Sequence, residues 1–342
     1  MNCYLSHNYK HFASAGNKAK SDMEAIMASM SFKDIGIGQS HKSSGIAHFA
    51  LNLAGVLKAV ATIKNGDVLF LQYPLKKYFS FICNMAHARG AKVVALIHDL
   101  SSCRRKTLTP EVEIRRLSNA DYIIATNDAM AAHLRSLGLK RPIGSLGCWD
   151  YLSDSIPKSS EHDGVKIAYA GSINRRKNTF LYEWGDVIDG YTVELYGGYF
   201  DDGGASCAEK FNCHGFVDAD KLISSVEADY GLVWDGASLD ECSGSFGEYL
   251  ALNTSHKVSL YLRSGLPIIV WDKSAMAPFV KKHGIGLTIS SLRELDKAVR
   301  AVSAEDYSAM KKKAIEVGER SASGYFFRQA ASDALKGLGK IG

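Results

Sequence analysis

The sequence predicts an α/β protein made of two domains, and three observations support this prediction. The 342 residues and the 46% hydrophobic content are sufficient for two separate cores. Short apolar runs alternate with helix-like segments along the chain, which is typical of parallel sheets covered by helices. A polar stretch without helical or strand periodicity spans 152–164, and this composition favours an interdomain linker.

The first half contains apolar runs that predict strands and periodic segments that predict helices. We expect strands at 3–5, 67–72, 92–97, 122–126 and 142–146, and helices at 18–30, 46–63, 77–89, 110–118 and 127–137. The third of these strands ends in His98-Asp99. Because ligands of open α/β sheets bind beyond the carboxyl ends of strands, Asp99 is a candidate general base for a hydroxyl group, with His98 as the competing base. The alternative is that Asp99 caps a helix or pairs with Arg104.

The second half repeats the pattern. We expect strands at 165–170, 191–195, 230–234, 268–271 and 284–287, and helices at 221–227, 249–264, 273–282, 292–302 and 325–340. The first of these strands gives way to Gly171-Ser172 and then to Arg175, Arg176 and Lys177. Glycine permits close approach of the backbone and arginine donates pairs of hydrogen bonds, so this strand end favours a phosphate site. A solvated run of charge is the alternative.

The stretch 249–271 carries the densest set of polar candidates. Tyr249, Asn253 and Lys257 recur every four residues, which on one continuous helix would place them on a single stripe. Gly265 is suited to end that helix, and an apolar strand follows. The pattern predicts one wall of a ligand site, with a solvated helix face as the alternative.

Other strand ends and possible metal ligands are less specific. Tyr196 ends a strand beside two glycines, where it would stack on a base or form a tight turn, and Asp235 ends another strand. Asp218 and Asp220 precede a helix and are assigned to its cap, not to a metal. Cys207, Cys213 and His214 lack a second ligand pair at standard spacing, so no metal site is expected. With no metal site expected, Tyr196 and Asp235 are the two additional candidate site residues of this half.

Charge and cysteine content limit the class of protein. Residues 1–158 hold 20 Lys/Arg and 11 Asp/Glu, whereas residues 159–342 hold 21 and 25. The basic half admits contact with anions or with an anionic membrane surface, and ordinary surface charge is the alternative. Seven cysteines without a C-x-x-C pair indicate a reducing compartment. With no apolar h-region and no run near the ~18 residues of a bilayer span, we expect a cytoplasmic protein, at most peripheral at the inner membrane face.

Several motifs are missing from the sequence. It has no G-x-S-x-G, no Walker loop and no H-E-x-x-H, and no G-x-G-x-x-G follows the first strand. Basic clusters are not interleaved with aromatic residues as a nucleic-acid groove requires, so nucleic acid is not an expected partner. An NAD-linked α/β enzyme is therefore the weakest of the interpretations considered.

Seven local strings, in chain order, carry a family resemblance: GNKAKSD (16–22), LQYP (71–74), IHDLSSCR (97–104), ADYIIATNDAM (120–130), YAGSINRRKN (169–178), DYGLVWDG (229–236) and YLALNTSHKVSLYLRSGLPIIVW (249–271). They resemble a bacterial branch of the GT-B glycosyltransferases that includes galactofuranosyltransferase-like enzymes and glucosyltransferases extending protein-linked GlcNAc. The resemblance covers nearly the whole chain. It implies two Rossmann-like domains facing across a cleft, with a C-terminal helix returning to the first. The expected limits are 1–155 for the acceptor-binding domain, 156–322 for the nucleotide-sugar domain and 323–342 for that helix.

The resemblance also implies roles for the candidate residues. Arg175 and Lys177, beside Gly171, would face the diphosphate of a UDP-sugar, and Tyr196 would lie near the uracil. Asn253 and Lys257 would contact phosphate or ribose beside Tyr249, and Asp235 would help to position the donor. Gly16 and Asn17 would border the diphosphate or the acceptor, with Asp99 and Arg104 in the acceptor cleft. Many retaining members carry a Glu about five residues before the glycine matching Gly265; here Leu260 stands there, so they are a poor guide to stereochemistry.

These inferences together predict a metal-independent hexosyltransferase that needs no cofactor. Its expected donor is a UDP-sugar carrying galactofuranose, glucose or galactose. Its expected acceptor is a lipid-linked or protein-linked saccharide in bacterial surface polysaccharide or glycoprotein synthesis. A catalytically silent subunit that binds nucleotide sugar is the alternative, and a homo-oligomer is left open.

Overall fold

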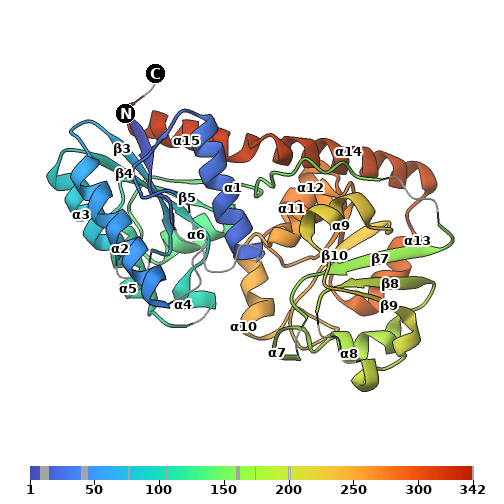
Figure 1. Ribbon diagram of the computed structural model, residues 1–342. Helices are drawn as coiled ribbons and strands as arrows, with labels where there is room; N and C mark the ends of the chain where they lie inside the picture. The colour runs from blue at the N-terminus through green and yellow to red at the C-terminus, as the bar shows by residue number, and fades with distance from the viewer. Residues whose placement is uncertain are drawn as a thin grey trace. The chain divides into compact units, whose positions relative to one another are not determined.

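The computed structural model describes residues 1–7, 15–39, 45–75, 78–104, 106–158, 162–173, 175–198, 200 and 202–340 (Figure 1). The chain forms two compact units, here called unit 1 and unit 2. Unit 1 comprises residues 1–150 with 324–342, and unit 2 comprises residues 151–323. The sequence places the corresponding divisions after 155 and after 322, so the two sets of limits differ by a few residues.

Unit 1 contains a six-stranded parallel sheet in the order β2-β1-β3-β4-β5-β6, counted over the described residues. Its strands are β1 (Asn2–Tyr4), β2 (Lys33–Asp34), β3 (Val68–Tyr73), β4 (Lys92–Ile97), β5 (Tyr122–Ala125) and β6 (Ile143–Ser145). Its helices are α1 (Ala15–Ser29), α2 (Gly45–Thr62), α3 (Tyr78–Ala88), α4 (Ser101–Arg104), α5 (Pro110–Leu117), α6 (Asp128–Ser136) and α15 (Tyr325–Gly337). The central strands β3 and β4 are buried almost throughout, as parallel strands covered on both faces must be.

Unit 2 contains a second six-stranded parallel sheet in its described residues, in the order β12-β11-β10-β7-β8-β9. Its strands are β7 (Val165–Ala170), β8 (Tyr191–Tyr196), β9 (Phe211–Gly215), β10 (Tyr230–Val233), β11 (Ile268–Trp271) and β12 (Gly286–Ile289). Its α-helices are α7 (Arg175–Asn178), α8 (Leu181–Trp184), α9 (Ala219–Ser225), α10 (Gly244–Gly247), α11 (His256–Arg263), α12 (Ala277–His283), α13 (Leu295–Arg300) and α14 (Ala304–Ala322). The 3₁₀ turns are η1 (Gly185–Val187), η2 (Asp202–Gly204), η3 (Ala208–Lys210), η4 (Glu248–Ala251) and η5 (Leu292–Glu294).

The last helix, α15, belongs to unit 1, as the sequence predicts for a returning C-terminal helix. The buried carboxylate of Asp150 accepts hydrogen bonds from the backbone N–H groups of Phe326 (3.0 Å) and Phe327 (2.7 Å). These groups lie in the first turn of α15, where backbone N–H groups have no partner within the helix. The Phe327 ring is fully buried and meets Phe70 of β3 edge-on, at 6.3 Å between centroids. Asp150 thus joins the end of the first Rossmann-like segment to the returning helix.

The predicted continuous helix over 249–264 is wrong. The chain forms the 3₁₀ turn η4, then an irregular step over 252–255, and only then α11. The hydroxyl of Ser255 accepts a hydrogen bond from the Lys257 backbone N–H at 3.4 Å and so starts α11. Asn, Thr and Ser side chains compete with the helical hydrogen bonds of the backbone, and Asn253-Thr254-Ser255 is such a run. The single stripe of Tyr249, Asn253 and Lys257 therefore does not form.

Two other helices differ from what the sequence predicts. Helix α14, one of the longest in the described chain, was not predicted, because its charged sequence has only a narrow apolar face. Helix α2 has 18 residues and a mean hydropathy of 1.3, which meets the length and composition of a membrane span. The expectation of no apolar stretch of that length is therefore wrong by those two criteria. Because Gly55, Val56 and Ala59 of α2 are buried within unit 1, the helix is also part of a folded core.

Candidate active site

The candidate site lies at the carboxyl edge of the sheet in unit 2, where β7 and β10 end side by side. Gly171 follows β7, and Trp234 and Asp235 follow β10. The Tyr169 hydroxyl donates to the Trp234 carbonyl oxygen at 2.9 Å and joins the two strand ends. This is the edge at which open parallel sheets bind ligands.

Asp235 is the centre of a buried polar cluster, here called the Asp235 cluster. Its Oδ1 atom lies 3.1 Å from Lys257 Nζ, 3.4 Å from Lys177 Nζ, 3.2 Å from Asn178 Nδ2 and 3.1 Å from the Tyr169 hydroxyl. The Lys257 ammonium also lies over the Tyr169 ring, 3.8 Å from its centroid. One carboxylate thus fixes two lysines that come from different segments of the chain.

The electrostatics of this cluster favour a bound anion. Burial alone would raise the pKa of Asp235, but the charges of Lys257 and Lys177 outweigh it and hold that pKa below its usual value. Burial lowers the pKa of Lys257 to about 8, although Asp235 acts in the opposite direction. At neutral pH two ammonium groups therefore face one carboxylate, and these three side chains carry a net positive charge. The amino end of α11 adds its own partial positive charge beside Lys257.

Tyr261 fixes α11 against the sheet, so that Lys257 points at the strand ends. The Tyr261 hydroxyl accepts a hydrogen bond from the Ala170 backbone N–H at 2.8 Å. Its ring lies against Gly231 of β10, where an added Cβ would come within 2.2 Å of the ring. Only glycine at position 231 leaves room for this packing. The position of Lys257 therefore depends on contacts that are distant in sequence.

Gly171 occupies a backbone conformation that favours glycine, with φ of +138°. A Cβ at this position would lie 3.3 Å from Cε of Lys257. The Gly171 N–H donates to the Tyr196 carbonyl oxygen at 2.9 Å, so the ends of β7 and β8 are bonded there. Gly171 thus leaves the backbone accessible beside the lysine, as a phosphate site requires.

Tyr196 is buried, and its ring stacks on His214 of β9, with 4.4 Å between centroids and an interplanar angle of 9°. Burial raises the pKa of Tyr196 to about 12, so its hydroxyl is neutral at physiological pH. The guanidinium of Arg175, an exposed residue, lies 4.0 Å from the centroid of the Tyr182 ring. Tyr196 therefore adjoins the Asp235 cluster through its backbone hydrogen bond to Gly171, and the Arg175 guanidinium lies on the Tyr182 ring.

Tyr249 and Asn253 precede α11 instead of sharing a helix with Lys257. Tyr249 is buried in η4, and its carbonyl oxygen accepts a hydrogen bond from the Asn253 N–H at 2.9 Å. Within the described residues the Oδ1 atom of Asn253 is buried and has no hydrogen-bond partner. A buried acceptor of this kind is suited to a hydroxyl group of a ligand.

The remaining candidates belong to unit 1. Asp99 follows β4 and forms an ion pair with Arg104 of α4, so the pairing considered as an alternative for Asp99 does occur. His98 is buried, with its Nε2 atom 2.7 Å from Gln72 Oε1 and its ring stacked on Trp149 at 4.6 Å. Asp99 is the more accessible of the two, with 28% of its side chain exposed. Gly16 and Asn17 lie in the first turn of α1.

Comparison with known protein families identifies the chain. Residues 2–148 match the model of the glucosyltransferase 3-like N-terminal domain, and residues 167–334 match the model of the corresponding C-terminal domain. The chain belongs to the glucosyltransferase 3-like family of GT-B glycosyltransferases. It is therefore an enzyme of the glycosyltransferase class, and the resemblance seen in the local strings is confirmed.

Characterised relatives of this glucosyltransferase 3-like chain cover most of its length. It is 28% identical over 337 residues to the β-1,6-galactofuranosyltransferase WbbI of Escherichia coli, a match that spans 95% of both chains. It is 24% identical to glucosyltransferase 3 of Streptococcus gordonii, over 81% of both chains. These relatives transfer two different sugars, so similarity to them does not select a donor.

Solved structures share the fold of this glucosyltransferase 3-like chain. Sucrose-phosphate synthase from Thermosynechococcus elongatus aligns over 98% of this chain and 99% of its own, with a TM-score of 0.62 and 14% identity. The Anabaena protein HepE in complex with UDP-glucose aligns over the full length of both chains, with a TM-score of 0.61 and 12% identity. At this level of identity the likeness establishes the GT-B fold alone.

Sequence reasoning missed three members of the site: Tyr169, Asn178 and Tyr261. Asn178 ends the cationic run after Gly171, and its amide bonds both Asp235 and the Tyr169 hydroxyl. An amide directly after three cations was an available signal. Tyr169 and Tyr261 look like ordinary apolar positions of a strand and a helix, so nothing in the local sequence marked them.

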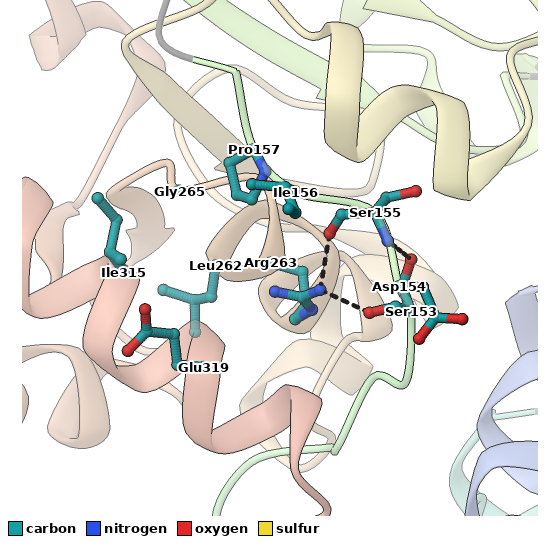
Figure 2. A pocket seen from close by; sticks show the side chains of 10 residues that line it. All are labelled: Ser153, Asp154, Ser155, Ile156, Pro157, Leu262, Arg263, Gly265, Ile315 and Glu319. Carbon is teal, nitrogen blue, oxygen red and sulfur yellow. Dashed lines mark hydrogen bonds between the residues drawn. The ribbon is translucent and has the colours of Figure 1, made fainter.

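A separate cavity of about 280 Å³ lies at the other end of α11 (Figure 2). The segment 153–157, the end of α11 and helix α14 line it. Arg263 spans one side and donates hydrogen bonds to the carbonyl oxygens of Ser153 (2.9 Å) and Ser155 (3.0 Å). These bonds hold the start of the linker against unit 2, and the cavity does not include the Asp235 cluster.

Proposed function

We propose that the protein transfers a hexose from a UDP-sugar to a hydroxyl group of a saccharide acceptor. In this reaction the acceptor oxygen forms a bond to the anomeric carbon, and the bond from that carbon to the diphosphate breaks. The electron pair leaves with UDP, so negative charge develops on the diphosphate. A fixed cationic site stabilises that charge more than it stabilises the donor, which is how such a site accelerates the transfer.

The single observation that carries this proposal is the Asp235 cluster at the amino end of α11. We assign Lys257 and Lys177 to the diphosphate, because both are held at the strand ends while Asp235 balances only one of their charges. The backbone at Gly171 contributes close approach, and the buried Oδ1 of Asn253 accepts a hydrogen bond from a ribose hydroxyl. We place the uracil near Tyr196, with Arg175 on the diphosphate side.

The donor assignment is tested by titration calorimetry with UDP. Lys257→Gln and Lys177→Gln each remove one ammonium, and we expect each to weaken UDP binding at least tenfold, or about 1.4 kcal/mol. Lys312→Gln is the matched control, because Lys312 is exposed on α14 and the substitution removes the same charge. Wild-type affinity in both cluster variants would overturn the diphosphate assignment.

We propose Asp99 as the base that takes the acceptor proton, with Arg104 holding its carboxylate in place. Asp99→Asn keeps the shape of the side chain and removes its basicity. We expect this variant to bind UDP as the wild type does and to release sugar from a UDP-hexose at least 100-fold more slowly, within the range general base catalysis contributes. Wild-type turnover in Asp99→Asn would exclude it as the base.

The alternative is a subunit that binds nucleotide sugar without transferring it. A thermal-shift screen of UDP-hexoses, followed by an assay of UDP release with the stabilising donor, separates the two proposals. Stabilisation without any release of UDP, with or without saccharide acceptors, would favour the silent subunit. We place the transfer in the cytoplasm, where the nucleotide sugar and a growing saccharide would meet.

A further inference from the structure

Helices α2 and α3 each expose large apolar side chains, here together called the α2–α3 face. It comprises Ile46, Phe49 and Leu57 of α2 and Phe81 of α3, with 85%, 48%, 56% and 46% of each residue exposed. The two helices contact each other and run side by side in Figure 1. Large apolar side chains exposed on two neighbouring helices are a candidate place of contact with an apolar partner.

The apolar residues on the exposed side of α2 recur at helical spacing. Ile46, Phe49, Leu53 and Leu57 recur at intervals of three and four residues, which places them on one stripe of the helix. Gly55 and Ala59 are buried on the other side, within unit 1, and Val56 is buried at the edge of the stripe. A helix that is apolar on its outer face as well as its inner face requires an apolar environment on both sides. Because its inner face is packed in unit 1, α2 is placed to lie along a bilayer surface and not to cross it.

Charge around this face identifies the occupant. Over the described residues 45–75 and 78–98 the chain holds four Lys/Arg and one acidic residue, Asp67, and one of the four, Lys92, is paired with Asp121 at 3.1 Å. Asp67 is buried and paired with the N-terminal amine at 3.0 Å, so it does not offset these cations at the surface. Lys58 and Lys64 are exposed at the carboxyl end of α2 or just beyond it, and Arg89 donates to the carbonyl oxygens of Ala61 and Ile63 there.

We propose that the α2–α3 face binds the surface of an anionic lipid bilayer. Apolar side chains enter the boundary between head groups and acyl chains, while the flanking cations bind the negative head groups. A second copy of this chain is disfavoured as the occupant, because two such faces would bring like charges together. The proposal is independent of donor binding. It favours a saccharide acceptor attached to a lipid over one attached to a protein.

Vesicle flotation tests this proposal with the full-length protein. We expect binding to vesicles of 30% phosphatidylglycerol in phosphatidylcholine, and at least tenfold weaker binding to phosphatidylcholine alone. Ile46→Ser combined with Leu57→Ser should weaken the binding more than tenfold, because both side chains are largely exposed and would enter the bilayer. Lys64→Gln should weaken it about fivefold, in line with the contribution of one surface cation. Phe216→Ser is the matched control, since Phe216 is 72% exposed in unit 2.

Two further measurements keep the outcome unambiguous. Calorimetry with UDP must give wild-type affinity in the Ile46→Ser, Leu57→Ser variant, which separates membrane binding from the donor site. Sedimentation velocity reports the oligomeric state of the same variant. No flotation of the wild type at low salt, or equal binding to neutral and anionic vesicles, would overturn the proposal. A wild-type dimer that the double substitution converts to a monomer, without a change in flotation, would assign the face to a second copy.

Discussion

The two ends of α11 each bury a cationic side chain, and they satisfy its charge in different ways. At the amino end, Lys257 lies 3.1 Å from the buried carboxylate of Asp235, which Lys177 also approaches. At the carboxyl end, Arg263 donates to two backbone carbonyl oxygens, and its Nε atom has no hydrogen-bond partner within the described residues. Burial lowers the pKa of Arg263, and the exposed Asp220 and Glu319 only partly offset this.

This difference separates a binding site from a structural contact. Carbonyl oxygens are neutral acceptors that already belong to the protein, so the hydrogen bonds of Arg263 hold the linker in place. The amino end of α11 has one more cation than this carboxylate balances, and the helix dipole adds to the imbalance. A diphosphate would place further negative charge beside these two lysines. The comparison therefore predicts that variants at the amino end change ligand binding, and that variants at the carboxyl end change stability alone.

The largest expected effect comes from Asp235→Asn. This substitution leaves Lys257 and Lys177 close together in a buried site, and breaking a buried ion pair in this way costs about 3 kcal/mol in the free energy of unfolding. Glu319→Gln is the matched change at the other end of α11, and we expect it to alter stability by less than about 0.5 kcal/mol because Glu319 is exposed. Urea denaturation at pH 7 measures both.

UDP sharpens this test, because its diphosphate replaces part of the lost negative charge. Saturating UDP should therefore restore more stability to Asp235→Asn than to the wild type. If Asp235→Asn and Glu319→Gln had the same small effect, Asp235 would not hold the two lysines, and the contrast between the ends of α11 would disappear.

The sequence contains much of this arrangement, but not all of it. Strand ends, Gly171, the cationic run and Lys257 were all identifiable, because hydrophobic runs and glycine turns are local signals. The interruption of the predicted helix at Asn253–Ser255 was not identifiable. The four-residue spacing of Tyr249, Asn253 and Lys257 favoured a continuous helix, whereas the capping residues Asn253, Thr254 and Ser255 opposed it. The low helix propensity of these three residues conflicted with the four-residue spacing, and in the structure Ser255 caps the start of α11.

Contacts distant in sequence account for most of what was missed. Tyr261 bonds the backbone of Ala170, 91 residues away, and Asn178 bonds Asp235, 57 residues away. No local pattern encodes such pairs. Asp99 illustrates the opposite case, because its partner Arg104 is five residues away and the ion pair was already an open alternative.

A smaller effect, in the pH dependence of donor binding, tests the same contrast. The pKa of Lys257 is about 8 in the ligand-free protein, and nearby phosphates would raise it. Below pH 8 the lysine is charged both with and without ligand, so affinity for UDP-glucose should be constant. Above pH 8 the free protein loses this proton and the complex retains it, so binding takes up a proton. Affinity should then fall by up to tenfold per pH unit until the pKa of the complex is reached.

Calorimetry with UDP-glucose from pH 7 to pH 9.5, in buffers of different ionisation enthalpy, measures both the affinity and the proton uptake. Lys257→Gln should bind more weakly and show a flat profile, whereas Arg263→Gln should keep the wild-type fall. A decline that persisted in Lys257→Gln would assign the titration to another group. If the affinity of the wild type for UDP-glucose did not change with pH, the Lys257 ammonium at the amino end of α11 would not be the group that binds the diphosphate.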